Sequence, residues 1–112
     1  MAGAYIPERG DLVWLEFTPH SGHEQSGRRP AMVLSPRSYN SASSLALFCP
    51  ITSKVKGYPF EVELPDGLPI KGAVITDQVK SLDWRARFAK FIAHAPKSAI
   101  SDVQAKVRTL ID

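Results

Sequence analysis

Gly22-His23-Glu24-Gln25-Ser26-Gly27-Arg28-Arg29-Pro30, followed by Ala31-Met32-Val33-Leu34-Ser35, is the stretch of this chain that decides the fold. The apolar run after the arginines is short and ends at Pro36, which predicts a buried strand over residues 30–35. A rigid strand therefore holds Arg29 at its first turn. The polar loop before it adds an imidazole, a carboxylate and an amide. A permanent charge on a scaffold beside titratable groups on a loop is typical of a site for an anion.

Working outward, short apolar or alternating segments bounded by turn residues predict further strands over 10–17, 45–52, 60–64, 72–76 and 84–92. The connection 36–44 is predicted to hold one helical turn. Pro50 lies inside the strand 45–52 and predicts an edge or a bulge, where a missing N–H is tolerated. In the segment from Trp84 to Phe88, apolar residues alternate with Arg85 and Arg87, which predicts a strand with the two arginines on one face.

Only the C-terminal segment has clear helical spacing. Pro96 suits a first-turn position, and Ile100, Val103, Val107, Leu110 and Ile111 recur every three to four residues. Short strands followed by one helix predict a mostly β fold, a small SH3-like barrel of about six or seven strands with a C-terminal α-helix. The length of 112 residues predicts a single domain over residues 1–112.

Composition and charge say more about the cellular location of the protein than about its activity. The net charge of +3 and pI near 9.2 are compatible with a polyanionic partner without requiring one. No apolar run approaches the roughly 20 residues of a membrane span, and residues 1–7 lack the features of a secretory signal. One cysteine, Cys49, provides no disulfide framework. These features predict a cytoplasmic protein with no membrane partner.

Metal and nucleophile chemistry have weak support. His20, His23 and His94, with one cysteine, do not supply the four spaced ligands of a zinc site, so we expect no metal or other cofactor. Cys49 lies between Phe48 and Pro50 in a predicted strand, where a cysteine is more often a core residue than a reactive thiol. No glycine-rich loop precedes a helix, so a nucleotide phosphate cradle is not predicted.

Anion chemistry remains, built from Arg29 and the polar ends of other strands. These ends are Thr52-Ser53-Lys54 with Lys56, then Asp77-Gln78 with Lys80, and Arg85 with Arg87. Any one of them alone is more simply a solvated strand end. Several strand ends can meet at the mouth of a small barrel, so the combination predicts a basic, hydroxyl-containing site.

Segments spread along nearly the whole chain match the pattern of one known family. They are Gly10-Asp11-Leu12-Val13-Trp14, Glu16-Phe17-Thr18-Pro19, Gly22 to Pro30, Val33-Leu34-Ser35-Pro36 with Tyr39-Asn40, Pro50-Ile51-Thr52-Ser53, Lys56-Gly57-Tyr58-Pro59-Phe60, and Asp77-Gln78-Val79-Lys80-Ser81 with Trp84-Arg85-Ala86-Arg87. In these segments the chain resembles the MazF/PemK family of toxin endoribonucleases. The Glu-Gln-x-Gly-x-Arg-Pro segment is specific when a Pro-x-Thr and an Asp-Gln follow it.

The resemblance implies a homodimer that cuts single-stranded RNA at short sequences without a metal. The 2′-OH would attack the adjacent phosphate and leave a cyclic phosphate and a 5′-OH end. It also implies a cognate antitoxin whose flexible acidic tail occupies the RNA groove.

By the same resemblance, Arg29 and Thr52 are the expected catalytic pair. A guanidinium and a hydroxyl can donate hydrogen bonds to the charged phosphoryl oxygens of the transition state. Arginine keeps its proton, so the general base is sought elsewhere. Glu24 and His23 are the first candidates. Asp77 ranks behind them, because the branch that uses this aspartate has an arginine where this chain has Ile75.

Further polar residues of the matching segments are expected to contact RNA through phosphates or base edges. They are Gln25, Arg28, Asn40, Ser53, Lys54, Lys56, Asp77, Gln78, Lys80 and Arg85, and Tyr58 and Phe60 could stack on bases. Two alternatives stay open. One is a non-catalytic toxin of the same fold that binds a protein target such as DNA gyrase, and the other is a plain RNA- or peptide-binding SH3-like module. The presence of both Arg29 and Thr52 favours the enzyme.

Overall fold

The computed structural model describes residues 5–17 and 27–112. Its elements in chain order are β1 (Asp11–Phe17), β2 (Gly27–Val33), α1 (Arg37–Ser43), β3 (Leu45–Thr52), β4 (Glu61–Glu63), β5 (Ala73–Ile75), the 3₁₀ turn η1 (Thr76–Gln78), β6 (Lys80–Asp83), β7 (Lys90–His94) and α2 (Lys97–Thr109). The predicted mostly β class with a C-terminal helix is confirmed. The second strand begins earlier than predicted, so both arginines lie within it.

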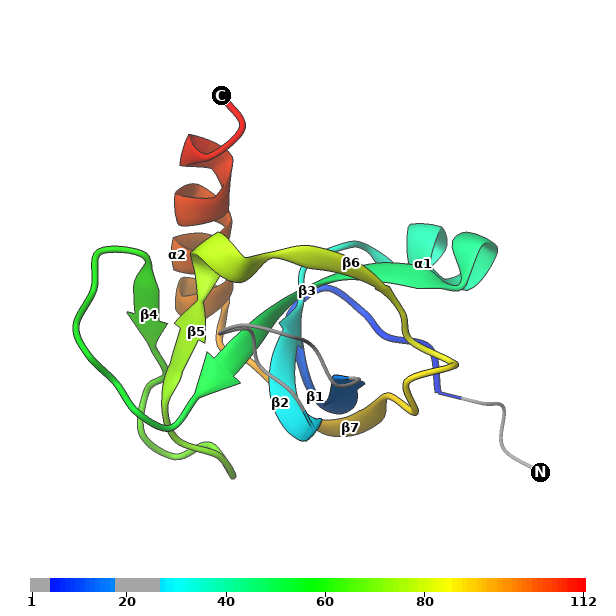
Figure 1. Ribbon diagram of the computed structural model, residues 1–112, viewed down its shortest axis with the longest axis horizontal. Helices are drawn as coiled ribbons and strands as arrows, with labels where there is room; N and C mark the ends of the chain where they lie inside the picture. The colour runs from blue at the N-terminus through cyan, green and yellow to red at the C-terminus, as the bar shows by residue number, and fades with distance from the viewer. Residues whose placement is uncertain (1–4, 18–26) are drawn as a thin grey trace.

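The strands form one antiparallel sheet with the order β4-β5-β3-β2-β1-β7, and β6 pairs with β3 beside β5. The sheet curls into the small barrel seen in Figure 1, with α2 standing outside it. β6 and β7 are connected by the turn 84–88, which spans the side of the barrel where the ladder is interrupted. This arrangement agrees with the predicted SH3-like barrel.

Apolar side chains fill both faces of the central strands. Val13, Leu15 and Phe17 of β1 point into the barrel and pack in a cluster with Phe48 and Trp84. Leu12 points the other way, into a second cluster that lies under α2. Because strand side chains alternate between faces, the start of β1 and the apolar half of β2 are buried on both sides, whereas Trp14 and Glu16 of β1 are half-buried. The charged residues of β2 lie in its first, exposed half.

Helix α2 covers the outer face of the sheet. It begins directly after Pro96, and its buried residues Ala99 and Val103 pack against the outer cluster together with Ile100 and Val107. The predicted apolar face is thus confirmed up to Val107. Leu110 and Ile111, just beyond the helix, are 45% and 79% exposed. Neither described helix combines the length and apolarity needed to span a bilayer.

Pro50 lies where β3 changes partner. On one side β3 pairs with β2 through Pro50 itself. On the other side β3 pairs with β6 up to Phe48 and with β5 from Ile51 onward, and η1 lies opposite the gap. The strand is central, and its register with β2 continues through Pro50 without a shift, so neither the expected edge nor the expected bulge is found at this residue.

The strand predicted over 84–92 is wrong in its first half. Residues 84–88 form a turn, because the Asp83 carboxylate accepts the backbone N–H groups of Arg85 and Ala86, both at 3.0 Å. Phe88 has φ of 56° and is 70% exposed. Only Trp84 is buried, with its indole N–H donating to the Asn40 carbonyl at 2.9 Å. Alternation in so short a segment matched a strand by chance.

Candidate functional site

Arg29 stands at the exposed end of β2. The strand is exposed over Gly27, Arg28 and Arg29 and buried from Ala31 onward. Arg29 is paired with Leu15 of β1, whose side chain is fully buried. The scaffold therefore fixes the backbone of Arg29 while leaving its side chain at the surface.

Thr52 ends the neighbouring strand and is half-buried. Ala31 of β2 pairs with Pro50 of β3. This is the last pair between the two strands, so Arg29 and Thr52 each lie two residues beyond it. The Thr52 Oγ1 accepts the Lys54 N–H at 3.1 Å, so its own proton remains to be donated to another acceptor.

Gly72, the residue just before β5, lies against the end of β3. It has φ of +136°, and a β-carbon there would lie 2.1 Å from the Thr52 carbonyl oxygen. Only glycine allows the two backbones to approach so closely. The backbone position of Thr52 is thus set by a residue distant in sequence.

A hollow of about 270 Å³ opens beside Thr52. Its lining combines a hydroxyl, two lysines, an aromatic ring and carboxylates: Thr52, Lys54, Lys56, Tyr58, Glu61, Ile75, Asp77 and Gln78. Six of these eight residues were named from sequence, five as site residues and Tyr58 as a residue that could stack on bases. The predicted convergence of strand ends is therefore observed for β3 and for the segment after β5.

The loop between β3 and β4 is folded around Glu61. Its Oε1 accepts the N–H groups of Lys56 and Gly57, each at 2.9 Å. The Lys56 Nζ lies 5.7 Å from the centroid of the Tyr58 ring. Sequence analysis missed Glu61, because an alternating strand residue gives no sign that its carboxylate organises the preceding loop.

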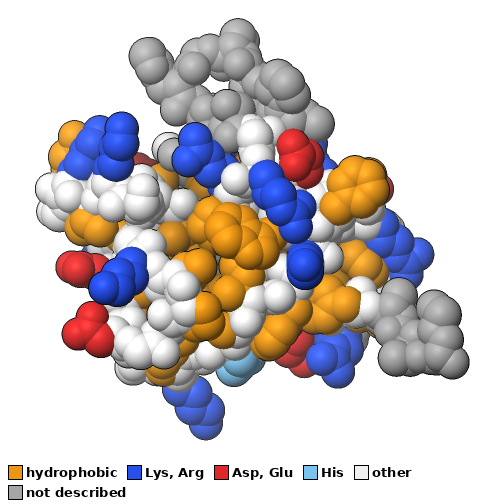
Figure 2. Space-filling view, turned by 90° about the horizontal axis from the view of Figure 1, so that it is seen from below, with side chains coloured by type: hydrophobic (Ala, Val, Ile, Leu, Met, Phe, Trp, Pro, Cys, Tyr) orange, Lys and Arg blue, Asp and Glu red, His pale blue; other side chains and the backbone are white. Residues whose placement is uncertain are grey.

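A second hollow of about 290 Å³ lies on the other side of the end of β3. It is lined by Trp14, Arg28, Arg29, Pro30, Ile51, Ser53, Ile70 and Lys71. Arg29 and Thr52 thus line neighbouring hollows, with Ser53 in one and Thr52 and Lys54 in the other. Figure 2 shows one face of the molecule, on which Lys and Arg side chains surround a central band of hydrophobic ones.

Two other predicted RNA contacts lie on or near the barrel wall. Lys80 is half-buried, with Nζ 6.0 Å from the centroid of the Phe17 ring. The Arg85 guanidinium lies 4.8 Å from the centroid of the Trp84 ring, in the turn after β6. Neither residue lines the two hollows beside Thr52 and Arg29.

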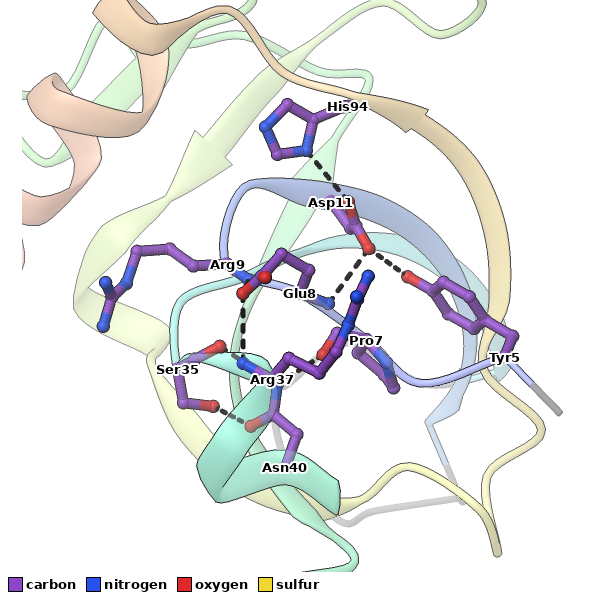
Figure 3. Close-up of polar contacts among 9 residues, drawn as sticks. All are labelled: Tyr5, Pro7, Glu8, Arg9, Asp11, Ser35, Arg37, Asn40 and His94. Atoms are coloured by element: carbon purple, nitrogen blue, oxygen red, sulfur yellow. Dashed lines mark hydrogen bonds and ion pairs between the residues drawn. The ribbon is translucent and has the colours of Figure 1, made fainter. Parts of the chain in front are cut away.

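The expectation that Asn40 contacts RNA is corrected. Asn40 is 0% exposed, and its Nδ2 donates to the carbonyls of Pro7 at 2.8 Å and Ser35 at 3.0 Å (Figure 3). Its Oδ1 accepts the Ser35 hydroxyl. The amide joins α1 to the chain segment before β1 and to the end of β2. The occurrence of Asn40 in a family motif is therefore explained by its structural role.

A polar cluster around Asp11 was not predicted. The Asp11 carboxylate accepts the Tyr5 hydroxyl at 2.5 Å and the Glu8 N–H at 3.0 Å, and its other oxygen lies 2.9 Å from His94 Nδ1 (Figure 3). Burial, then this hydrogen bond, raises the pKa of Tyr5 strongly. The imidazole of His94 is thus used in a contact with the Asp11 carboxylate. Its spacing in sequence from Asp11 gave no signal for this contact.

Cys49 is a buried core residue, as predicted. Desolvation by burial, and secondly the nearby charge of Asp77, raises the pKa of its thiol to about 12. Such a thiol is not a nucleophile at neutral pH. Within residues 5–17 and 27–112, no three His, Cys, Asp or Glu side chains are grouped to hold a metal ion.

Three predicted residues, His23, Glu24 and Gln25, lie outside the described residues. They include both first candidates for the general base. The described site therefore consists of the basic and hydroxyl groups at the ends of β2 and β3 and the polar residues that follow β5.

Curated relatives match nearly the whole chain. The chain is 44% identical over 111 residues to the endoribonuclease toxin MazF of Escherichia coli K12, covering 99% of both proteins. It is 33% identical over 111 residues to the endoribonuclease toxin ChpB of the same organism, covering 94% of both.

Solved structures agree. A crystal structure of MazF from Deinococcus radiodurans superposes with a TM-score of 0.92 at 52% identity, covering 96% of this chain and 98% of that one. A MazE-MazF crystal structure from the same organism gives a TM-score of 0.87 at 50% identity, covering 96% and 97%. The family model described as PemK-like, MazF-like toxin of type II toxin-antitoxin system matches residues 8–111, and the chain belongs to this family.

Proposed function

We propose that this protein is a sequence-specific, metal-independent endoribonuclease toxin that cleaves single-stranded RNA, mRNA included, and is neutralised by a cognate antitoxin. Full-length similarity to proteins named endoribonucleases supports the activity. The structural observation that carries the proposal is that Arg29 and Thr52 each lie two residues beyond the last β2–β3 pair and line neighbouring hollows at the end of β3. The relatives named here do not favour a gyrase-binding toxin.

The chemistry follows from what these two side chains offer. The ribose 2′-OH gives its proton to the general base and attacks the adjacent phosphorus, and the P–O5′ bond breaks as the leaving 5′-oxygen takes a proton from water. The products are a 2′,3′-cyclic phosphate and a 5′-OH end. Negative charge gathers on the phosphoryl oxygens in the transition state, where Arg29 supplies two parallel donors and Thr52 a third. Each well-placed donor of this kind is worth about 10²–10³ in rate. The need for a 2′-OH excludes DNA as a substrate.

The general base comes from the segment that precedes β2. Arg29 does not serve, because a guanidinium keeps its proton at neutral pH. Glu24 and His23 are the candidates, and both could accept the 2′-OH proton near pH 7. Asp77 is assigned to RNA binding, because the residue two positions before it is Ile75 rather than an arginine.

Two lysines of the β3–β4 loop suit the RNA backbone. Lys54 and Lys56 are exposed and line the hollow beside Thr52, where ammonium groups would contact phosphates. Arg28 and Ser53 play the same part in the second hollow. Four further residues remain proposed contacts to RNA: Gln25, Gln78, Lys80 and Arg85.

Assembly is proposed from the exposed apolar side chains of β3 and the end of α2. Leu45 and Leu47 are 37% and 39% exposed on the central strand, and Leu47 and Ile111 line one small hollow. This surface suits the interface of a homodimer. The antitoxin is assigned a flexible acidic tail that competes with RNA for the basic site, consistent with the MazE-MazF complexes of relatives. We place the single domain in the cytoplasm, where its mRNA substrate is found.

The test is cleavage of a defined single-stranded RNA by the purified protein in EDTA, with both product ends mapped. Wild type should give a cyclic phosphate and a 5′-OH at a short fixed sequence, and Arg29→Ala should lower the rate about 10²–10³-fold. Lys97→Ala, an exposed cation at the start of α2, is the matched control and should cleave normally. Absence of cleavage by wild type, or an unaffected Arg29→Ala, would refute the proposal.

A further inference from the structure

We propose that the hollow between Tyr58 and Asp77 binds one unstacked base of the RNA and selects a base that carries an amino group over uracil. This inference rests on the proposed function and assigns a specificity role within the same site. The hollow measures about 260 Å³ and is lined by Tyr58, Pro59, Phe60, Glu61, Ile75 and Asp77. It shares Tyr58, Glu61, Ile75 and Asp77 with the hollow that holds Thr52, so the two hollows adjoin.

The walls of this hollow suit a flat aromatic ligand. Tyr58 is 60% exposed, so its ring is available at the surface, and Phe60, Pro59 and Ile75 supply further apolar area. Single-stranded RNA is commonly bound by stacking its splayed bases on such side chains. The phosphates on either side of that base would then face Lys54 and Lys56, which line the adjoining hollow beside Thr52.

The hollow is formed before any ligand arrives. Glu61 holds the Lys56 and Gly57 N–H groups, which fixes the path of the loop that carries Tyr58. On the opposite wall, the Thr76 hydroxyl and N–H both bond to the Phe60 carbonyl, at 2.5 and 3.0 Å, which joins the segment of Asp77 to that of Phe60. Both walls are therefore tied to the sheet, so little ordering is needed on binding.

Asp77 is the group that can read the base. Glu61 already accepts two backbone N–H groups, whereas the exposed Asp77 carboxylate has no hydrogen bond or ion pair within residues 5–17 and 27–112. An ionised carboxylate only accepts hydrogen bonds. Adenine and cytosine each present an amino group, and guanine presents an amino and an imino group. Uracil presents two carbonyl oxygens beside its single N–H, and these oxygens would meet a negative charge.

The first experiment measures binding without cleavage. Fluorescein-labelled 12-mers of oligo(A), oligo(C) and oligo(U) are titrated against the cleavage-deficient Arg29→Ala protein by anisotropy at one fixed salt concentration. Oligo(A) or oligo(C) should bind about tenfold more tightly than oligo(U), as expected for one charge-assisted hydrogen bond. Adding Asp77→Asn should bring that ratio close to one, because an amide both donates and accepts. Asp66→Asn, an exposed carboxylate in the β4–β5 turn, is the matched control.

The second experiment maps cleavage sites of wild type and Asp77→Asn on a long mixed RNA. Wild type should exclude uracil at one position of its recognition sequence, and Asp77→Asn should admit uracil at that position alone. Tyr58→Ala should raise KM while Tyr58→Phe keeps it. Two results would overturn the base pocket. One is that oligo(U) binds as tightly as oligo(A) and oligo(C). The other is that Asp77→Asn alters the base preference at every position of the recognition sequence. A wild type that binds with the expected ratio but does not cleave would instead refute the proposed activity.

Discussion

Gly72 and Thr52 lie in contact through their backbones, with a hypothetical Gly72 β-carbon only 2.1 Å from the Thr52 carbonyl oxygen. The Gly72 carbonyl also accepts the Leu64 N–H at 2.8 Å. A residue of the β4–β5 segment therefore sets the backbone position of the hydroxyl proposed to act in cleavage.

Gly72→Ala should impair both stability and cleavage. The methyl group would overlap backbone atoms that cannot move aside, and φ of +136° is strained for any other residue. We expect a loss of about 2 kcal/mol or more in the free energy of unfolding, and a reduced kcat in the protein that folds. Gly67→Ala, also at positive φ but with open space around it, is the control. It should cost less stability and leave kcat unchanged.

Thr52→Val should lower kcat while Thr52→Ser retains most of it. Valine keeps the shape of threonine but has no donor for the phosphoryl oxygens, so a loss of about 10²-fold is expected. The half-buried position tolerates either side chain, and melting temperatures should stay close to that of wild type. Single-turnover cleavage of a defined RNA checks the rate. Equal kcat for Val and Ser would show that the hydroxyl takes no part.

Tyr5→Phe should make the free energy of unfolding fall less steeply with pH in the alkaline range. Burial, then the hydrogen bond to Asp11, raises the pKa of Tyr5 far above its value of 10.0 in the unfolded chain. A raised folded pKa contributes stability that is fully present below about pH 10 and declines as the pH rises above it. Urea unfolding from pH 8 to 11 measures the slope. The slope above pH 10 should be smaller for Tyr5→Phe, and Tyr58→Phe should behave as wild type if the effect belongs to Tyr5.

Asp83 should contribute to stability until strongly acid pH. The Ala86 N–H first, then the Ser44 hydroxyl and the Arg85 N–H, lower the pKa of this carboxyl below 3.8. A lowered folded pKa gives stability that is present above the unfolded pKa and is lost as the pH falls through the folded value. Asp83→Ala should lower the melting temperature at pH 7, with the difference from wild type shrinking below pH 4. A constant difference at all pH values would contradict this.

Asn40→Ala should destabilise the protein without a specific effect on RNA binding. The change leaves the buried carbonyl groups of Pro7 and Ser35 without their donor, which costs about 2–4 kcal/mol together with the cavity. Chemical denaturation gives the free energy, and anisotropy with single-stranded RNA gives Kd at a temperature where the variant is folded. A higher Kd for RNA at unchanged stability would show that Asn40 contacts RNA, as the sequence predicted.

Local patterns predicted the parts of the fold that local energetics control. The apolar runs after Arg29 and before Thr52 became buried strands, and the spacing up to Val107 became the covered face of α2. The turn at 84–88 was missed because it depends on the Asp83 carboxylate and on a tryptophan reaching α1. Alternation alone carries no information on such contacts.

The candidate site was predicted by residue type and motif rather than by geometry. Thr52, Lys54, Lys56, Asp77 and Gln78 do line one hollow. Glu61 and Gly72 were missed, because their importance comes from contacts with residues four to twenty positions away. Asn40 was assigned the wrong part for a related reason: a polar residue in a motif looks like a ligand contact until its burial is known.

The burial of the start of β1 and the inner half of β2 on both faces also limits how new substrate preferences can arise. A strand residue that changes there disturbs one hydrophobic cluster or the other. Variation that alters the cleaved sequence is therefore expected to collect in the segments after β3 and β5, while the interior is inherited almost unchanged. Relatives could in this way share one framework and yet destroy different sets of transcripts.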